Sequence, residues 1–366
     1  MKIKEIIREI ERRAPVALQE GFDNCGVQVG DVDAEAIGAL ICLDVSEAVV
    51  DEALAHGCNL IISHHPLAFK PFKSLTGRND TERCMMKACR HELVIYAAHT
   101  NLDNALGGLN FVLARRIGLQ SVRILSPKEG ALLKLAVFVP NAHAEAVRKA
   151  IFEAGAGQIG MYDSCSFAVG GEGSFRAGED CRPFCGEVGL LHKEPEMRIE
   201  TIMPAYLKPS VVRALLNAHP YEEPAFDLYP LANSWAGAGS GIIGELPKEE
   251  DAREFLLRIK GLFGSESLKH SAILKPMLKR IAVCGGSGSF LIPEAASAGA
   301  DILITGEAKY NDYYDASDRG LLLAVAGHYE TEWGAATEAL SEIISKKFPT
   351  FAQHISNVNF NPIKYL

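Results

Sequence analysis

Two adjacent histidines, His64 and His65, follow directly on the apolar run of residues 60–62 and precede Pro66. The run is too short for a helix face, and the proline excludes continuation into a central strand, so a buried strand is predicted to end here. Because neighbouring side chains of an extended chain point to opposite sides, the two imidazoles can serve two metal ions. Taken alone, the motif fits equally well with two ordinary histidines at a strand-to-loop junction.

Three further apolar runs, at residues 93–98, 301–305 and 321–326, also end in possible metal ligands. These ligands are His99 and Asp103 after the first run, Glu307 after the second, and His328 and Glu332 after the third. The carboxyl ends of parallel strands meet at one edge of a sheet, where open α/β folds place their ligands. The spacing of four between the last two puts both on one helix face. Imidazoles combined with carboxylates suit zinc, manganese or iron, so we predict a metal site.

The elements predicted around these residues alternate between strand and helix. Isoleucine recurs at helical spacing over residues 3–13, residues 39–44 form a buried strand, and Ser46 is a plausible N-cap of the helix that follows. This alternation predicts mostly parallel sheets with helices on their faces. Asp23, in a glycine-flanked loop, is compatible with a functional role, but a turn is the commoner explanation, and Asp103 is also compatible with a helix N-cap.

The pattern changes over residues 127–232, where strand, helix, strands, helix and strand follow one another. This is the order of a ferredoxin-like α+β domain. The predicted architecture is therefore an α/β metal-binding core in two parts, residues 1–126 and 233–366, interrupted by an inserted domain.

Composition narrows the class of protein. The chain has 366 residues, 48% of them hydrophobic and 23% charged, which is ordinary for a globular protein. A formal charge of −9 argues against a nucleic-acid partner. No apolar run approaches the roughly 18 residues that span a bilayer, and the charged N-terminus has no signal-peptide core, so a cytoplasmic protein without a membrane partner is expected.

The cysteines also favour a cytoplasmic location. There are nine, an odd number, scattered along the chain and partly inside apolar runs, as expected of reduced thiols. Cys181 and Cys185, with His192 nearby, are the only suggestive spacing. Three possible ligands in a glycine-rich stretch are a weak zinc signal, and we favour unliganded thiols.

The motifs together resemble the NGG1-interacting-factor-three family, whose members are often described as homologues of a type 2 GTP cyclohydrolase I. The motifs are Ser63-His64-His65-Pro66, Ala98-His99-Thr100-Asn101-Leu102-Asp103, Thr305-Gly306-Glu307 and Gly327-His328-Tyr329-Glu330-Thr331-Glu332. The resemblance implies a dinuclear centre of two divalent metal ions per chain. Its implied ligands are His64, His65, Asp103, His328 and Glu332.

The same resemblance implies a PII/CutA-like fold for the insert, whose end matches His219-Pro220-Tyr221-Glu222-Glu223-Pro224, and a ring-shaped homohexamer with the metal sites facing an internal cavity. Two positions depart from the family pattern. Phe22 stands where tryptophan is usual, which we expect to be a packing change. Asn311 replaces a frequent histidine, which weakens any proton shuttle at that position.

Two metal ions about 3.5–4 Å apart would share a carboxylate and a bridging water and lower the pKa of that water toward neutrality. This favours metal-dependent hydrolysis of a nucleotide-like or phosphoester substrate, with Glu307 and His99 as catalytic groups that assist or carry protons. The alternative is a non-catalytic metal-binding or regulatory protein in which the PII-like insert senses an unidentified small-molecule effector.

Anion binding has weaker candidates. Lys70, Lys73 and Arg78 lie in the loop after the first histidine pair, and the Gly/Ser turn of residues 285–289 follows a predicted strand. Such a turn can present backbone N–H groups to an anion. Charged loop residues are more often merely solvated.

Overall fold

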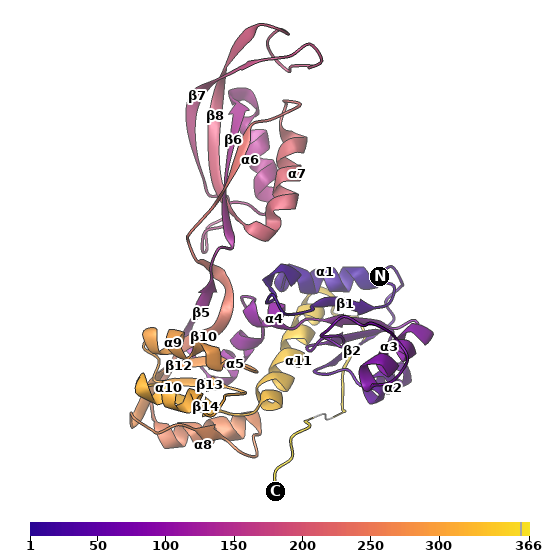
Figure 1. Cartoon of the computed structure of the whole chain (residues 1–366), viewed down its shortest axis with the longest axis vertical. Coiled ribbons are helices and arrows are strands. Elements are labelled where there is room, and N and C mark those ends of the chain that lie inside the picture. Colours follow the sequence, from indigo (N-terminus) through magenta and orange to yellow (C-terminus); the bar gives the residue numbers. More distant parts are fainter. Residues whose placement is uncertain (359–360) are drawn as a thin grey trace. The chain divides into compact units, whose positions relative to one another are not determined.

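A computed structural model of the chain describes residues 1–358 and 361–366 and divides it into two compact units (Figure 1). The core unit comprises Met1–Ser126 and Ala238–Leu366, and the inserted unit comprises Pro127–Gly237. The inserted unit therefore ends at Gly237, a few residues after residue 232, at which the sequence pattern places its end. Among the described residues, no helix has the length and apolar character needed to cross a membrane.

The first sheet of the core unit has the strand order β1-β4-β3-β2-β15. The strands are β1 (Gly26–Val29), β2 (Ala39–Cys42), β3 (Leu60–Ser63), β4 (Val94–Ala97) and β15 (Gln353–Ile355). All neighbours are parallel except β1, which pairs antiparallel with β4 at the edge. Every residue of β2, β3 and β4 is buried, which explains their continuous apolar runs. Because Ser63 pairs with Ala97, the residues after β3 and β4 emerge side by side.

Helices cover both faces of this sheet. They are α1 (Ile3–Arg13), α2 (Glu47–Ala55) and α3 (Asp80–Arg90). The side chain of Ser46 accepts a hydrogen bond from the Val49 amide, so it caps α2 as predicted. Apolar side chains of α2 and α3 pack on the sheet in one cluster that includes Leu40, Ile61 and Ile95. Figure 1 shows α1 on the opposite side of the sheet.

The second sheet has the order β11-β14-β13-β12-β10-β5. Its strands are β5 (Gln120–Lys128), β10 (Trp235–Asp251), β11 (Lys269–His270), β12 (Met277–Cys284), β13 (Ile302–Thr305) and β14 (Leu322–Val325). The central β12, β13 and β14 are parallel, whereas β10 and β11 join them antiparallel. Cys284, Thr305 and Val325 lie in register at the ends of the parallel strands. Helices α8 (Ala252–Phe263), α9 (Ile292–Ser297) and α10 (Asp312–Asp318) accompany this sheet.

Helix α11 (His328–Lys347) connects the two halves of the core unit (Figure 1). It begins directly after β14 of the second sheet and contacts β2 of the first sheet. It also packs against α1 and against α5 (Leu109–Ile117), which follows the short helix α4 (Thr100–Asn104). The first turn of α11 is thereby held at the edge where β3 and β4 end.

The inserted unit has the element order β6-α6-β7-β8-α7-β9 and an antiparallel sheet in the order β7-β8-β6-β9. The elements are β6 (Leu132–Pro140), α6 (Ala144–Glu153), β7 (Ser166–Arg176), β8 (Leu191–Pro204), α7 (Lys208–Ala218) and β9 (Phe226–Pro230). Both helices pack on the sheet around a core of its own that includes Val137, Ile151, Ile199 and Leu215.

Candidate metal centre

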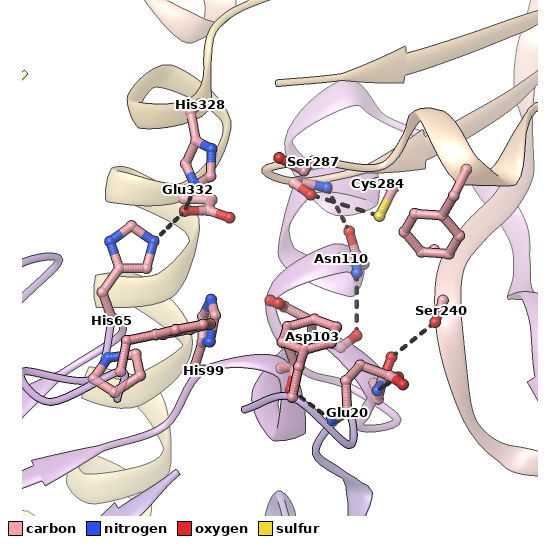
Figure 2. A pocket seen from close by; sticks show the side chains of 18 residues that line it. Glu20, His65, His99, Asp103, Asn110, Ser240, Cys284, Ser287, His328 and Glu332 are labelled. Atoms are coloured by element: carbon pink, nitrogen blue, oxygen red, sulfur yellow. Dashed lines mark hydrogen bonds and ion pairs between the residues drawn. The ribbon is translucent and has the colours of Figure 1, made fainter. Parts of the chain in front are cut away.

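The structure brings the five implied ligands and His99 together at one end of the core unit. All of them except His64 are labelled in Figure 2. His64 and His65 follow β3, and His99 follows β4. Asp103 lies within α4 and does not cap a helix, which corrects the simpler interpretation of this residue. His328 and Glu332 occupy the first turns of α11, on one face as their spacing predicts.

His64 has a fixed tautomer with one nitrogen aimed into the site. Its Nδ1–H donates to the Ala98 carbonyl at 2.8 Å, so Nε2 is the nitrogen left as an acceptor. The ring is fully buried, yet Nε2 has no hydrogen-bond partner among the described residues. This atom lies 3.6 Å from Asp103 Oδ1, which is also buried without such a partner, and 3.9 Å from Glu332 Oε1. Buried polar atoms are normally satisfied, so this pair is a candidate position for a cation.

Glu332 lies between two further imidazoles (Figure 2). Its Oε2 is 2.8 Å from His65 Nε2 and 2.9 Å from His328 Nε2. Close approach of α11 depends on two glycines. A Cβ at Gly286, where φ is +60°, would lie 2.1 Å from Glu332 Oε1, and a Cβ at Gly306 would lie 2.8 Å from the His328 Cα.

Three further imidazoles are held by a carboxylate at their Nδ1 atom. His65 Nδ1 lies 2.7 Å from Asp44 Oδ1, and His99 Nδ1 lies 2.8 Å from Asp23 Oδ1. His328 Nδ1 is 3.1 Å from Glu307 Oε1. These contacts leave the Nε2 atoms directed inward, as in the carboxylate–histidine–metal arrangement of known metal sites.

Sequence reasoning missed two of these carboxylates. The sequence pattern assigns Asp44 no role, although Asp44 follows β2, the parallel neighbour of β3, and that position is the available signal. Asp23 is more than a turn residue, because its carboxylate is fully buried and also accepts a hydrogen bond from the Thr100 amide at 3.0 Å.

The side-chain charges are strongly coupled. Burial opposes protonation of His65 and His328, but the surrounding carboxylates outweigh it and raise the pKa of His65 to about 10 and that of His328 to about 9. Burial also disfavours charge on Glu332, yet hydrogen bonds from these imidazoles hold its pKa well below the usual range. Burial and the negative charge of Glu332 raise the pKa of Asp103 to about 8. A cation beside Asp103 would favour its charged form.

Two groups of donor atoms can each hold a metal ion. The atoms of His64, His65 and His99 lie within 4.8 Å of one another, as do those of His65, His328 and Glu332. His65 belongs to both groups. His99, expected only as a catalytic group, therefore also lies where a ligand would be.

A pocket of about 620 Å³ opens beside these residues (Figure 2). Its wall includes the aromatic rings of Phe22, Phe69 and Phe290 together with polar groups such as Asn110 and Ser287. Phe22 is 66% exposed, so its departure from the family pattern changes this lining and not the packing of a core.

The two groups of anion-binding candidates differ in their position relative to the pocket. Lys70, Lys73 and Arg78 are exposed, and the described lining of the pocket includes none of them. The turn after β12 does reach the pocket, but three of its backbone N–H groups are engaged within the chain. The amides of Gly285, Gly286 and Gly288 donate to Asn110, Thr331 and Thr305, respectively. An anion site at this turn is therefore not supported.

The fold and the converging imidazoles and carboxylates define a mixed α/β protein with candidate metal-binding clusters. The chain belongs to the Duf34/NIF3 (NGG1p interacting factor 3) family, whose sequence pattern matches residues 1–362. The family resemblance drawn from the motifs is therefore confirmed.

Relatives and solved structures agree with this assignment over nearly the whole chain. The chain is 40% identical over 326 residues to a protein of Halalkalibacterium halodurans, covering 88% of this chain and 87% of that one. It is 36% identical over 367 residues to a Bacillus subtilis protein, covering 99% and 98%. Both relatives are named GTP cyclohydrolase 1 type 2 homolog. The crystal structure of a Bacillus cereus protein related to NIF3 matches with a TM-score of 0.84 at 37% identity, covering 100% of this chain and 99% of that one.

Proposed function

We propose that the core unit binds two divalent metal ions. The ligands in this proposal are His64, His65, Asp103, His328 and Glu332. The observation that carries it is the pair of buried, unpartnered atoms, His64 Nε2 and Asp103 Oδ1, which face each other 3.6 Å apart. A mixed set of imidazoles and carboxylates suits zinc, manganese or iron, whereas calcium prefers oxygen ligands alone.

The reaction that we propose for this centre is hydrolysis. When bound, a pair of divalent ions supplies Lewis-acid polarisation and activates water at neutral pH. His99 is suited to carry a proton, because Asp23 holds its Nδ1–H and its other nitrogen remains available at the pocket. Glu307 acts indirectly in this proposal, by holding the Nδ1 of His328.

The pocket favours a substrate with a planar ring. Phe22, Phe69 and Phe290 can stack on a heterocyclic base, while the ligand side chains lie on another part of the same lining. A nucleotide-like or other phosphoester substrate of this form fits a volume of about 620 Å³, which is in the range of small-molecule sites. The names of the relatives, which refer to GTP cyclohydrolase, support the nucleotide-like class.

We further propose that the inserted unit is a ferredoxin-like domain of the PII/CutA type and that the chain assembles as a homohexamer. The strand and helix order of the unit, with its antiparallel sheet, supports the first statement. The second rests on the family to which the chain belongs.

A turnover screen tests the hydrolase. Full-length protein loaded with zinc, manganese or iron is assayed against GTP, other nucleotides and phosphoesters, with chelator-treated protein as the reference. We expect metal-dependent turnover, and Asp103→Asn should lower kcat more than it changes KM. Asp318→Asn, which alters an exposed carboxylate on α10, is the matched control.

Absence of metal-dependent turnover from fully metallated protein across this screen would contradict the hydrolase. That result would favour the alternative, in which the chain is a non-catalytic metal-binding or regulatory protein and the inserted unit is its sensor.

A further inference from the structure

We propose that the inserted unit carries a separate site for a thiophilic divalent cation, with zinc as the representative ion, formed by Cys185, His192 and Glu194. One donor atom from each residue lies within 4.8 Å of the other two. This cluster lies in a different unit from the centre described above and shares no residue with it.

The alternation of β8 places two of the donors. Successive side chains of a strand point to opposite faces, so His192, Glu194 and Glu196 share one face. That face is the less exposed one at this end of the strand, since Leu191, Lys193 and Pro195 are exposed. His192 Nε2 and Glu194 Oε2 lie 2.9 Å apart, so the two donor atoms already converge on one point.

The third donor arrives on the loop that precedes β8. Gly186 follows Cys185 and has φ of +80°, a conformation that L side chains rarely adopt. A Cβ at this position would lie 2.8 Å from the Cβ of His192. Only glycine lets the loop approach this closely, and the approach brings the thiol to the imidazole.

Neighbouring side chains hold the donors in place. The Tyr221 hydroxyl lies 3.6 Å from Cys185 Sγ and donates to Glu196 Oε1 at 2.9 Å. The ring of Phe175 packs between those of His192 and Tyr221, with centroid separations of 5.4 and 5.8 Å. A site supported in this way needs little rearrangement to bind an ion.

The donor types select the ion. Thiolate, imidazole and carboxylate are the zinc donors of proteins, at about 2.3 Å for sulfur and about 2.0–2.2 Å for nitrogen and oxygen, whereas calcium and magnesium prefer oxygen alone. The side chains of His192 and Glu194 are each 27% exposed, so three protein ligands would leave a position open to water. Such a site exchanges its ion more readily than a closed structural site.

This assignment revises the interpretation of the cysteines as unliganded thiols. The spacing drew attention to Cys181 and Cys185 as a pair, but Cys181 is exposed and lies outside the cluster. The third donor of the cluster is Glu194. The spacing of cysteine and histidine along the sequence does not reveal that Glu194 lies opposite the loop.

Cobalt titration of the full-length protein tests the site, because a cobalt–thiolate bond gives a charge-transfer absorption that nitrogen and oxygen ligands do not. We expect this absorption in the wild type, its loss on addition of zinc, and one bound zinc ion fewer per chain in Cys185→Ser. Glu194→Gln keeps the shape of the side chain but removes its charge, and it should weaken zinc binding. Far-ultraviolet circular dichroism checks that each variant remains folded.

Two controls make the test specific. Cys181→Ser removes an exposed thiol from the same loop and should change neither the absorption nor the zinc content. His65→Ala alters the centre in the core unit and should leave the absorption intact. The proposal is overturned by equal losses in Cys181→Ser and Cys185→Ser, by no thiolate absorption in the wild type, or by an absorption that survives in Cys185→Ser, which would assign it to another of the free cysteines.

Discussion

His64 Nε2 faces Asp103 Oδ1 across 3.6 Å, and neither buried atom has a hydrogen-bond partner among the described residues. His64 follows β3 and Asp103 lies in α4 after β4, so the parallel pairing of these strands sets the distance between them. An unsatisfied buried polar atom costs about 1–3 kcal/mol, and more when it is charged. A cation bound between these two atoms would satisfy both of them.

The first prediction concerns metal content. His65 belongs to both donor groups, so His65→Ala should lower the content from about two ions per chain. Elemental analysis after reloading with zinc, manganese or iron measures this content. The measurement uses a Cys185→Ser background, because this variant removes the proposed site of the inserted unit and leaves only the ions of the core unit to be counted. His91→Ala, at an exposed histidine after α3, should have no effect. A wild type that retains no ion after reloading would mean that the cluster is structural.

The second prediction concerns Asp44, which the ligand set does not include. Its carboxylate orients His65 through Nδ1 at 2.7 Å, and loss of such an anchor typically lowers metal affinity about 10-fold to 100-fold. Competition with a chromogenic chelator should show this loss in Asp44→Asn but not in Asp318→Asn. Equal affinities in the two variants would show that Asp44 does not position the ligand.

The third prediction is pH-dependent stability. Glu338 on α11 accepts hydrogen bonds from Arg116 of α5 at 2.6 and 2.9 Å. Burial opposes its charge, but hydrogen bonds from Arg115 and Arg116 lower the pKa of Glu338 below its ordinary value. The contribution of Glu338 to the stability of the fold is therefore fully present above the pKa that Glu338 has in the unfolded chain. It is lost as the pH falls through the lower pKa that Glu338 has in the folded chain.

Denaturant unfolding should therefore show Glu338→Gln to be less stable than the wild type by about 1 kcal/mol at pH 7, since the side chain is partly exposed. The difference should shrink as the pH falls below about 4.3. Glu342→Gln is the control, because Glu342 is 55% exposed and contacts Arg115 alone in the same network, so its effect should be smaller. A pH-independent difference would exclude the charge as its cause.

The fourth prediction concerns the independence of the inserted unit. Because it has its own core, replacing residues 127–237 by a short Gly/Ser linker should leave the metal content of the core unit unchanged. The thiolate absorption of the further site should disappear in the same protein. A soluble deletion variant without metal in its core would show that the insert is integral to the centre.

The fifth prediction concerns assembly. Family membership leads us to expect a ring-shaped hexamer, with a mass about six times the 39.6 kDa of the chain. Light scattering coupled to size-exclusion chromatography measures this mass directly. A stable monomer at micromolar concentration would contradict the expectation.

Much of the core unit follows from local sequence. Runs such as 60–63 and 302–305 are mostly apolar and buried throughout because both faces of a parallel sheet are covered, and the residues that follow them carry the candidate site. The strand β7 in the glycine-rich stretch is harder to predict from sequence. It is mostly exposed, and its pairing with β8 depends on backbone that is distant in the chain. The roles of Asp23, Asp44 and Glu194 depend on which side chain lies across a strand or loop, and spacing along one chain does not contain that information.

His65 and Glu332 are 267 positions apart in the chain but 2.8 Å apart in space. The inserted unit lies between them in the sequence, so its own core can form before α11 leaves the ribosome. The nascent chain thus carries an incomplete set of donors for most of its synthesis. The donor group of His65, His328 and Glu332, unlike that of His64, His65 and His99, is therefore complete only once α11 has been synthesised.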